Sequence, residues 1–134
     1  MNDQPPELVQ DWLLRARSSL KLGRAGLRTQ GVLPEDVCFH AQQCAEKALK
    51  GFLTCLGIPH PRTHALEVLL DLLKAHDIQV PANVDEAFEL TQYAVQTRYP
   101  GEWEPVTKAE ARHALERAAL LLAWVESKIH SQTG

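Results

Sequence analysis

The sequence predicts an all-α protein, an antiparallel up-and-down bundle of four to five helices. Apolar residues recur at helical spacing through most of the 134 residues, and prolines and glycines divide the chain into five such segments. No segment has the alternating pattern of a strand. The length, without any internal repeat, indicates a single helical domain over residues 6–130.

The first helix is expected over residues 7–29, because Leu13, Leu20 and Leu27 repeat every seven residues and form one apolar face. The second is expected over residues 34–56, with Pro34 at its start and Gly57 just after its end. Two prolines then interrupt the chain before the third helix.

Thr63 is the expected cap of a leucine-rich third helix over residues 64–76. Asn83, followed by Glu86, predicts the start of a fourth helix that reaches residue 97. After a turn-rich loop, Thr107 and Glu110 form a capping box for a fifth helix over residues 108–130.

The composition excludes several classes of protein. A formal net charge of -3 speaks against general nucleic-acid binding driven by charge, though a local basic patch remains compatible with it. Three cysteines without a C-x-x-C pair indicate buried thiols in a reducing compartment. The chain lacks an apolar run of the ~20 residues that span a bilayer. Its first residues do not resemble a signal peptide, so we expect a cytoplasmic protein.

One edge of the second helix is polar. His40, Gln43, Lys47 and Lys50 fall within about 80° on the helical wheel, beside an alanine-rich apolar face. Such an edge is typically solvated. Alternatively, the imidazole, the amide and the two ammonium groups converge on an anion such as phosphate, and the histidine changes charge near neutral pH.

Three segments together resemble a known family. The stretches FHAQQCAEKALKGFL (39–53), RTHALEVLL (62–70) and TRYP (97–100) have the order and spacing of the HEPN domain family (higher eukaryotes and prokaryotes nucleotide-binding). The resemblance covers about residues 7–130. It implies a helical bundle that forms a homodimer. It also implies partnership with a minimal nucleotidyltransferase encoded nearby, in a toxin–antitoxin-like pair, with nucleotide binding or metal-independent RNA cleavage as activities.

The RNase members of the family carry an arginine, four to six residues of any kind, and then a histidine. Here no histidine follows an arginine at that distance, and the pairs Arg62/His64 and Arg112/His113 are too closely spaced. The sequence therefore favours a non-catalytic module, and we assign no catalytic residue. The alternative is an RNase with a rearranged site, since His40, His64 and Arg98 could activate a 2′-hydroxyl and stabilise a phosphorane.

A basic stripe follows the first helix. Its members lie within about 60° on the helical wheel and are Arg17, Lys21, Arg24 and Arg28. The stripe is either a solvated face or a docking site for an acidic partner or a nucleic-acid backbone. The negative net charge of the chain favours the protein partner.

Two further groups complete the candidates. Arg98 and Tyr99 precede a loop with Trp103, where the aromatic rings could close one end of the bundle and the guanidinium could hold phosphate. His60 and His64 are separated by Pro61 and have no third ligand, so we expect no metal site and no cofactor. The candidate nucleotide- or anion-binding residues are His40, Gln43, Lys47, Lys50, His64, Arg98 and Tyr99.

Overall fold

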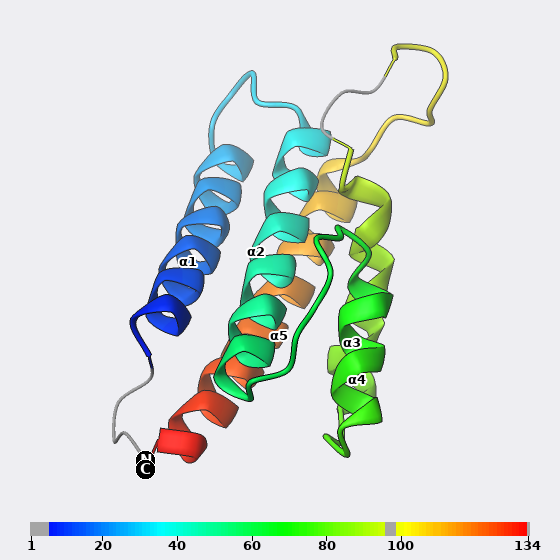
Figure 1. Cartoon of the computed structure of the whole chain (residues 1–134). Coiled ribbons are helices and arrows are strands. Elements are labelled where there is room, and N and C mark those ends of the chain that lie inside the picture. The colour runs from blue at the N-terminus through cyan, green and yellow to red at the C-terminus, as the bar shows by residue number, and fades with distance from the viewer. Residues whose placement is uncertain (1–5, 96–98, 134) are drawn as a thin grey trace.

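The computed structural model describes residues 6–95 and 99–133, and all regular structure in these ranges is helical (Figure 1). The elements are α1 (Glu7–Leu27), α2 (Pro34–Cys55), α3 (Leu66–Ala75), the short α4 (Ala82–Asp85), the 3-10 helix η1 (Glu86–Tyr93) and α5 (Lys108–Thr133). The predicted all-α bundle is confirmed. None of the helices in these ranges is both long and apolar enough to cross a membrane.

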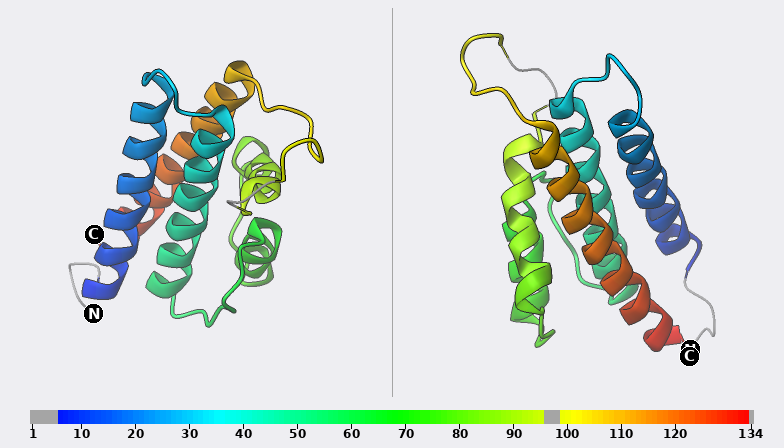
Figure 2. Two further views of the ribbon diagram at one scale, coloured as in Figure 1. Left: turned by 90° about the horizontal axis from the view of Figure 1, so that it is seen from above. Right: turned by 180° about the vertical axis from the view of Figure 1, so that it is seen from behind.

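The helices form three layers, with α2 and α5 in the middle (Figures 1 and 2). Helix α1 covers one side of this central pair, and α3 with α4–η1 covers the other. Residues 56–65 return along α2, so that α3 runs in the same direction as α2. Helices α1 and α5 run in opposite directions (Figure 2).

Helix α2 ends where the sequence predicts, at a left-handed glycine. Gly57 has φ +72°. Its N–H donates to the Thr54 carbonyl at 3.0 Å, and the Ile58 N–H donates to the Leu53 carbonyl at 2.9 Å. Helix α3 ends with the same pair of hydrogen bonds, although Asp77, with φ 64°, occupies the left-handed position.

The expected start of the third helix is wrong by two residues. The Thr63 hydroxyl accepts a hydrogen bond from the Ala65 N–H at 3.1 Å, which forms a local turn before the helix. Helix α3 begins at Leu66, and the Leu66 N–H donates to the Thr91 hydroxyl at 3.0 Å. A side chain distant in sequence therefore satisfies the first helical N–H, and only the folded chain reveals it.

Of the five predicted helices, the fourth differs most from the structure. Pro81, not Asn83, precedes α4, and after one turn the chain continues as a 3-10 helix that ends at Tyr93. The buried residues of this segment, Val84, Ala87, Leu90 and Tyr93, lie every third residue. A 3-10 helix has 3.0 residues per turn, so this spacing places all four on one side, against the core.

Helix α2 is the centre of the core. Its alanine-rich face is fully buried, and the Phe52 ring packs edge-on against Trp124 of α5 with centroids 5.5 Å apart. Cys38 and Cys44 are buried thiols, as the sequence predicts, whereas Cys55 is half-buried. Burial raises the pKa of Cys44 to about 12, so this thiol is protonated at neutral pH.

Candidate functional site

The polar edge of α2 separates into two clusters. His40, Gln43 and Lys47 are half-buried beside α1, whereas Lys50 is buried against Glu46. On the helical wheel Lys50 is about 80° from His40 but only about 40° from Glu46. The lysine therefore bends towards the carboxylate one turn earlier in α2.

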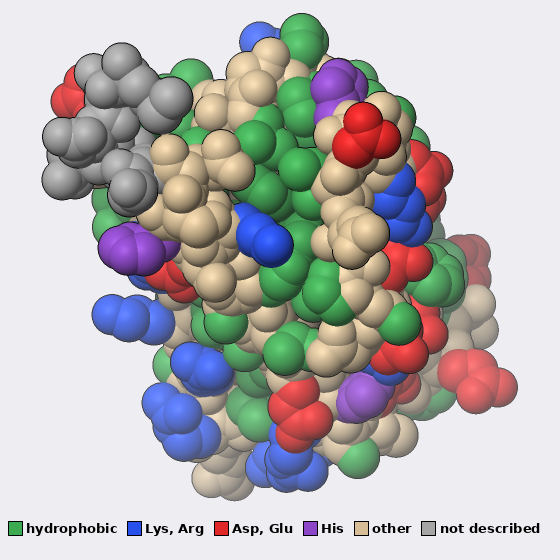
Figure 3. Space-filling model, turned by 90° about the horizontal axis from the view of Figure 1, so that it is seen from below, with side chains coloured by type: hydrophobic (Ala, Val, Ile, Leu, Met, Phe, Trp, Pro, Cys, Tyr) green, Lys and Arg blue, Asp and Glu red, His purple; other side chains and the backbone are tan. Residues whose placement is uncertain are grey.

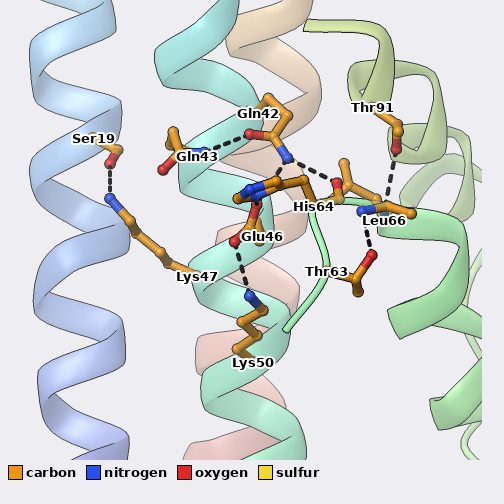
Figure 4. Close-up of polar contacts among 11 residues, drawn as sticks. Ser19, Gln42, Gln43, Glu46, Lys47, Lys50, Thr63, His64, Leu66 and Thr91 are labelled. Carbon is orange, nitrogen blue, oxygen red and sulfur yellow. Dashed lines mark hydrogen bonds and ion pairs between the residues drawn. The ribbon is translucent and has the colours of Figure 1, made fainter. Parts of the chain in front are cut away.

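The first cluster lines a shallow pocket between α1 and α2. The pocket has a volume of about 200 Å³. The Lys47 ammonium donates to the Ser19 hydroxyl at 3.1 Å across the two helices (Figure 4). The lining residues are Arg15, Ser18, Ser19 and Leu22 of α1 and Phe39, His40, Gln43 and Lys47 of α2.

The two basic groups of α2 in this pocket are shifted in pKa. Burial lowers the pKa of Lys47, and the nearby Arg15 lowers it further, although Glu46 opposes the shift. Burial and the neighbouring Lys47 lower the pKa of His40, while Asp36 opposes the shift. An anion bound between them would favour their charged forms and raise both pKa values.

The second cluster is built around the Glu46 carboxylate, whose side chain is 7% exposed. One carboxylate oxygen accepts a hydrogen bond from the Gln42 amide at 3.1 Å and lies 2.9 Å from His64 Nδ1. The other accepts from the Lys50 ammonium at 2.9 Å. The Gln43 amide donates to the Gln42 side-chain oxygen at 2.7 Å, which links the two clusters (Figure 4).

The Glu46 carboxyl is ionised in this setting. Burial opposes ionisation, but hydrogen bonds from Lys50, His64 and Gln42 outweigh it and lower the pKa of Glu46. A carboxylate can only accept, so Nδ1 of His64 is the donor. The ring is 69% exposed, and its other nitrogen, Nε2, remains available to a ligand or a proton.

The connector between α2 and α3 is fixed to the same cluster. The Gln42 amide donates a second hydrogen bond, to the His64 carbonyl, at 3.0 Å. Both the backbone and the ring of His64 are therefore held against α2 (Figure 4). This anchoring determines where the imidazole lies.

The remaining candidates lie elsewhere. Tyr99 is 68% exposed and lines a pocket with Glu35 and Trp103 at one end of the bundle. Arg98 lies outside the described residues. In the basic stripe, Arg17 forms an ion pair with Glu126 of α5 at 2.6 Å, while Lys21, Arg24 and Arg28 are exposed. The structure thus brings the predicted anion-binding residues together in two clusters and places Tyr99 apart from both.

Sequence reasoning missed Gln42, Glu46 and the contribution of α1. Glu46 was not among the predicted site residues, whereas its carboxylate is the centre of the second cluster. A signal for it existed, because Glu46 and Lys50 have the i, i+4 spacing of a helical ion pair. Arg15 and Ser19 carried no comparable signal, since their role depends on how α1 and α2 pack.

Charge is unevenly distributed over the surface. Figure 3 shows Lys and Arg side chains gathered towards the α1 side of the lower face and Asp and Glu side chains towards the α3 and α4 side. The acidic side includes Glu67, Asp85 and Glu86, of which Asp85 and Glu86 form ion pairs with Lys74 and Arg117. On the α1 side, Arg15 and Arg17 form ion pairs with Asp11 and Glu126.

Comparisons with known proteins agree with this architecture. The family model described as HEPN domain matches residues 9–128. A solved structure described as "ST0689, an archaeal HEPN homologue" is 31% identical, with a TM-score of 0.72 over 90% of this chain and 97% of that one. The structure of TT1696 from Thermus thermophilus is 36% identical, with a TM-score of 0.75 and the same coverage. No curated protein matched. From the family model and these two structures, the chain belongs to the HEPN domain family.

Proposed function

We propose that this protein is a non-catalytic helical module that works as a homodimer with a minimal nucleotidyltransferase, in a toxin–antitoxin-like pair, and contributes a nucleotide- or substrate-binding site. The observation behind the proposal is the pocket between α1 and α2, where Arg15, His40 and Lys47 surround a space of phosphate size. Membership of the HEPN family also supports this proposal.

The chemistry of the pocket suits a phosphorylated ligand. Charged nitrogen donors bind phosphate oxygens strongly, and Ser18 and Ser19 add hydroxyl donors. Leu22 and Phe39 offer apolar contact for the uncharged part of a ligand. The volume, about 200 Å³, is below the range typical of ligand pockets. That range is about 300–1,000 Å³. We therefore propose that this chain holds the phosphate end, and that the partner completes the site.

Nucleotide binding is tested by calorimetry with ATP, GTP and AMP. Lys47→Ala removes an ammonium that faces the pocket, so we expect the affinity to fall about tenfold or more, equivalent to roughly 1.4 kcal/mol. Lys128→Ala, at an exposed position of α5, serves as the matched control and should bind as the wild type does. An absence of heat at millimolar ligand would rule out this binding role.

The partnership is tested by searching the neighbouring genes for a minimal nucleotidyltransferase and by co-expressing this chain with the protein found. We expect the two proteins to copurify and light scattering to give the mass of a dimer for this chain alone. A monomer that recovers no nucleotidyltransferase would contradict the proposal.

A second candidate is a metal-independent RNase with a rearranged site, and the pairing of His64 with Glu46 favours it. The buried carboxylate holds Nδ1, so Nε2 could accept the proton of a 2′-hydroxyl. Purified protein would be incubated with total RNA in EDTA. Cleavage that is lost in His64→Ala and weakened in Glu46→Gln supports this candidate. Equal cleavage by wild type and His64→Ala, or none by either, would eliminate it.

A further inference from the structure

An apolar groove lies between α1 and α5, two helices that can be followed in Figure 2. Its volume is about 460 Å³. Leu120 is 41% exposed here, a large fraction for a leucine in the middle of a helix. The floor is formed by Leu27, Leu115, Ala119 and Leu120, and the rims by Arg24, Arg112 and Glu116.

The packing of the backbone builds this groove. A Cβ atom at Gly23 would lie 2.6 Å from Cδ2 of Leu115, so the Leu115 side chain packs against α1 in the space that a side chain at residue 23 would occupy. The ion pair between Arg17 and Glu126 joins the same two helices further towards the C-terminus of α5. The groove lies on the other side of Gly23, towards Leu27, and is therefore formed before any partner binds.

The rims carry positive charge that the chain does not neutralise. Among the described residues, the two lining cations Arg24 and Arg112 form no ion pair, and neither do Lys21 and Arg28, which belong to the same stripe of α1 as Arg24. Glu116 is the one carboxylate on the lining. A chain with a net charge of -3 thus concentrates unpaired cations beside an apolar floor.

We infer that this groove receives an amphipathic helix from a partner protein, with apolar side chains on the floor and carboxylates against Arg24 and Arg112. The inference rests on the proposed function only in identifying the partner as the nucleotidyltransferase. The unpaired stripe from Lys21 to Arg28 rises about 10 Å along α1, which matches about two turns of a partner helix. Spacing of i, i+3, i+4 and i+7 presents such an apolar row.

Two other occupants fit less well. A second copy docked by two-fold symmetry would place the same patch on both sides, and the four unpaired cations would then face one another. A nucleic-acid backbone would match the cations, but it offers no apolar side chains for Leu115, Ala119 and Leu120. An acidic amphipathic helix supplies both apolar side chains for the floor and carboxylates for the cations on the rims.

The test uses the full chain and a fluorescein-labelled 15-residue peptide with leucines at i, i+3, i+4 and i+7 and glutamates on both flanks. Anisotropy should show binding that weakens as salt rises. Arg24→Glu and Arg112→Glu should each weaken it at least tenfold, and Ala119→Glu should abolish it. Arg62→Glu, on the exposed connector, is the matched control and should bind as the wild type does.

Several results would overturn the inference. These are no binding by the wild type, equal binding of a peptide with lysines in place of the glutamates, or equal binding of a scrambled peptide. A wild-type dimer that dissociates in Ala119→Glu would show that a second copy fills the groove. Lys47 lies in the other pocket, so failure of nucleotide binding leaves the peptide result standing. A peptide that binds while no nucleotidyltransferase copurifies contradicts the proposed function alone.

Discussion

Glu46 is the residue on which most of the polar structure depends. Its carboxylate accepts from Gln42 and Lys50, and it holds the ring of His64. Both Glu46 and Lys50 are buried, so each charge lacks water and is stabilised by the other. Removing one member of such a pair costs more than the pair itself contributes, because the remaining charge is left buried.

Glu46→Gln should therefore destabilise the protein by about 3–5 kcal/mol, because it leaves the Lys50 ammonium buried without a carboxylate. Urea unfolding followed by circular dichroism at pH 7 measures the change. Asp11→Asn removes the exposed ion pair with Arg15 and should cost less than about 1 kcal/mol. The double variant Glu46→Gln/Lys50→Met should recover much of the loss. Similar values for Glu46→Gln and Asp11→Asn would contradict this account.

The same carboxylate predicts a pH dependence. The pKa of Glu46 in the folded protein is below its ordinary value, so the unfolded state takes up the proton first as the pH falls. The stabilisation is fully present above the unfolded value, about 4.3. It is lost as the pH falls through the lower, folded value. Between pH 5 and pH 3 the wild type should lose stability more steeply than Glu46→Gln, as measured by urea unfolding at each pH. Parallel curves would argue against an ionised, hydrogen-bonded Glu46.

Residue patterns predicted part of this site. His40, Gln43 and Lys47 share a face because helical spacing alone determines their relative angle, and the structure places them in one pocket. The direction taken by Lys50 was not predictable in the same way. The direction of a long, flexible side chain depends on the group that it contacts, here the Glu46 carboxylate. The burial of Glu46 in turn depends on the connector, which the hydrogen bonds of His64 hold against α2.

At the scale of the elements, glycines determine how closely α2 packs against its neighbours. Gly51 is buried near the C-terminal end of α2, where an added Cβ would lie 3.0 Å from Cβ of Trp12. A Cβ is fixed to its backbone, so α1 would have to move. This contact explains why α2 has a residue of low helix propensity at this position.

Gly51→Ala should destabilise the protein by up to about 2 kcal/mol. Helix propensity favours alanine by about 1 kcal/mol, but overpacking against a fixed neighbour costs about 1–3 kcal/mol and should exceed that gain. The melting temperature and urea midpoint measure the net effect. Ser127→Ala, at an exposed position of α5, should stay within about 0.5 kcal/mol of the wild type. A more stable Gly51→Ala would mean that α1 and α2 can separate without cost.

The element boundaries show which sequence signals were sufficient. The glycine after α2 and the Thr107 hydroxyl, which accepts from the Glu110 N–H at 3.0 Å, act where the sequence places them, because each acts on neighbouring backbone. The start of α3 and the 3-10 form of η1 depend on contacts with distant residues. The one signal in the sequence for the 3-10 form of η1 was that its apolar residues Val84, Ala87, Leu90 and Tyr93 occur every third residue.

Across the whole molecule, the three layers are not equally well connected. Helices α1, α2 and α5 pack along most of their length, whereas α3 and η1 contact α2 over short stretches (Figure 2). The bundle class followed from helical periodicity in the sequence. The path of residues 56–65 back along α2 did not, because it depends on hydrogen bonds that the Gln42 amide donates to the His64 carbonyl and the His64 ring donates to Glu46.

This unequal packing predicts a hierarchy of local stability that hydrogen exchange followed by mass spectrometry can measure. Amides of α3 and η1 should exchange faster than those of α2, because both elements have fewer buried contacts than α2. In η1 the hydrogen bonds also have the poorer geometry of a 3-10 helix. Gln42→Ala removes the donor to the His64 carbonyl and should speed exchange mainly in peptides from residues 58–75. Thr54→Ala, which loses only a hydrogen bond within α2, should leave those peptides unchanged. Equal protection of α3 and α2, or an effect of Gln42→Ala spread evenly over all helices, would show that the layers unfold as one unit and that the connector is not held locally.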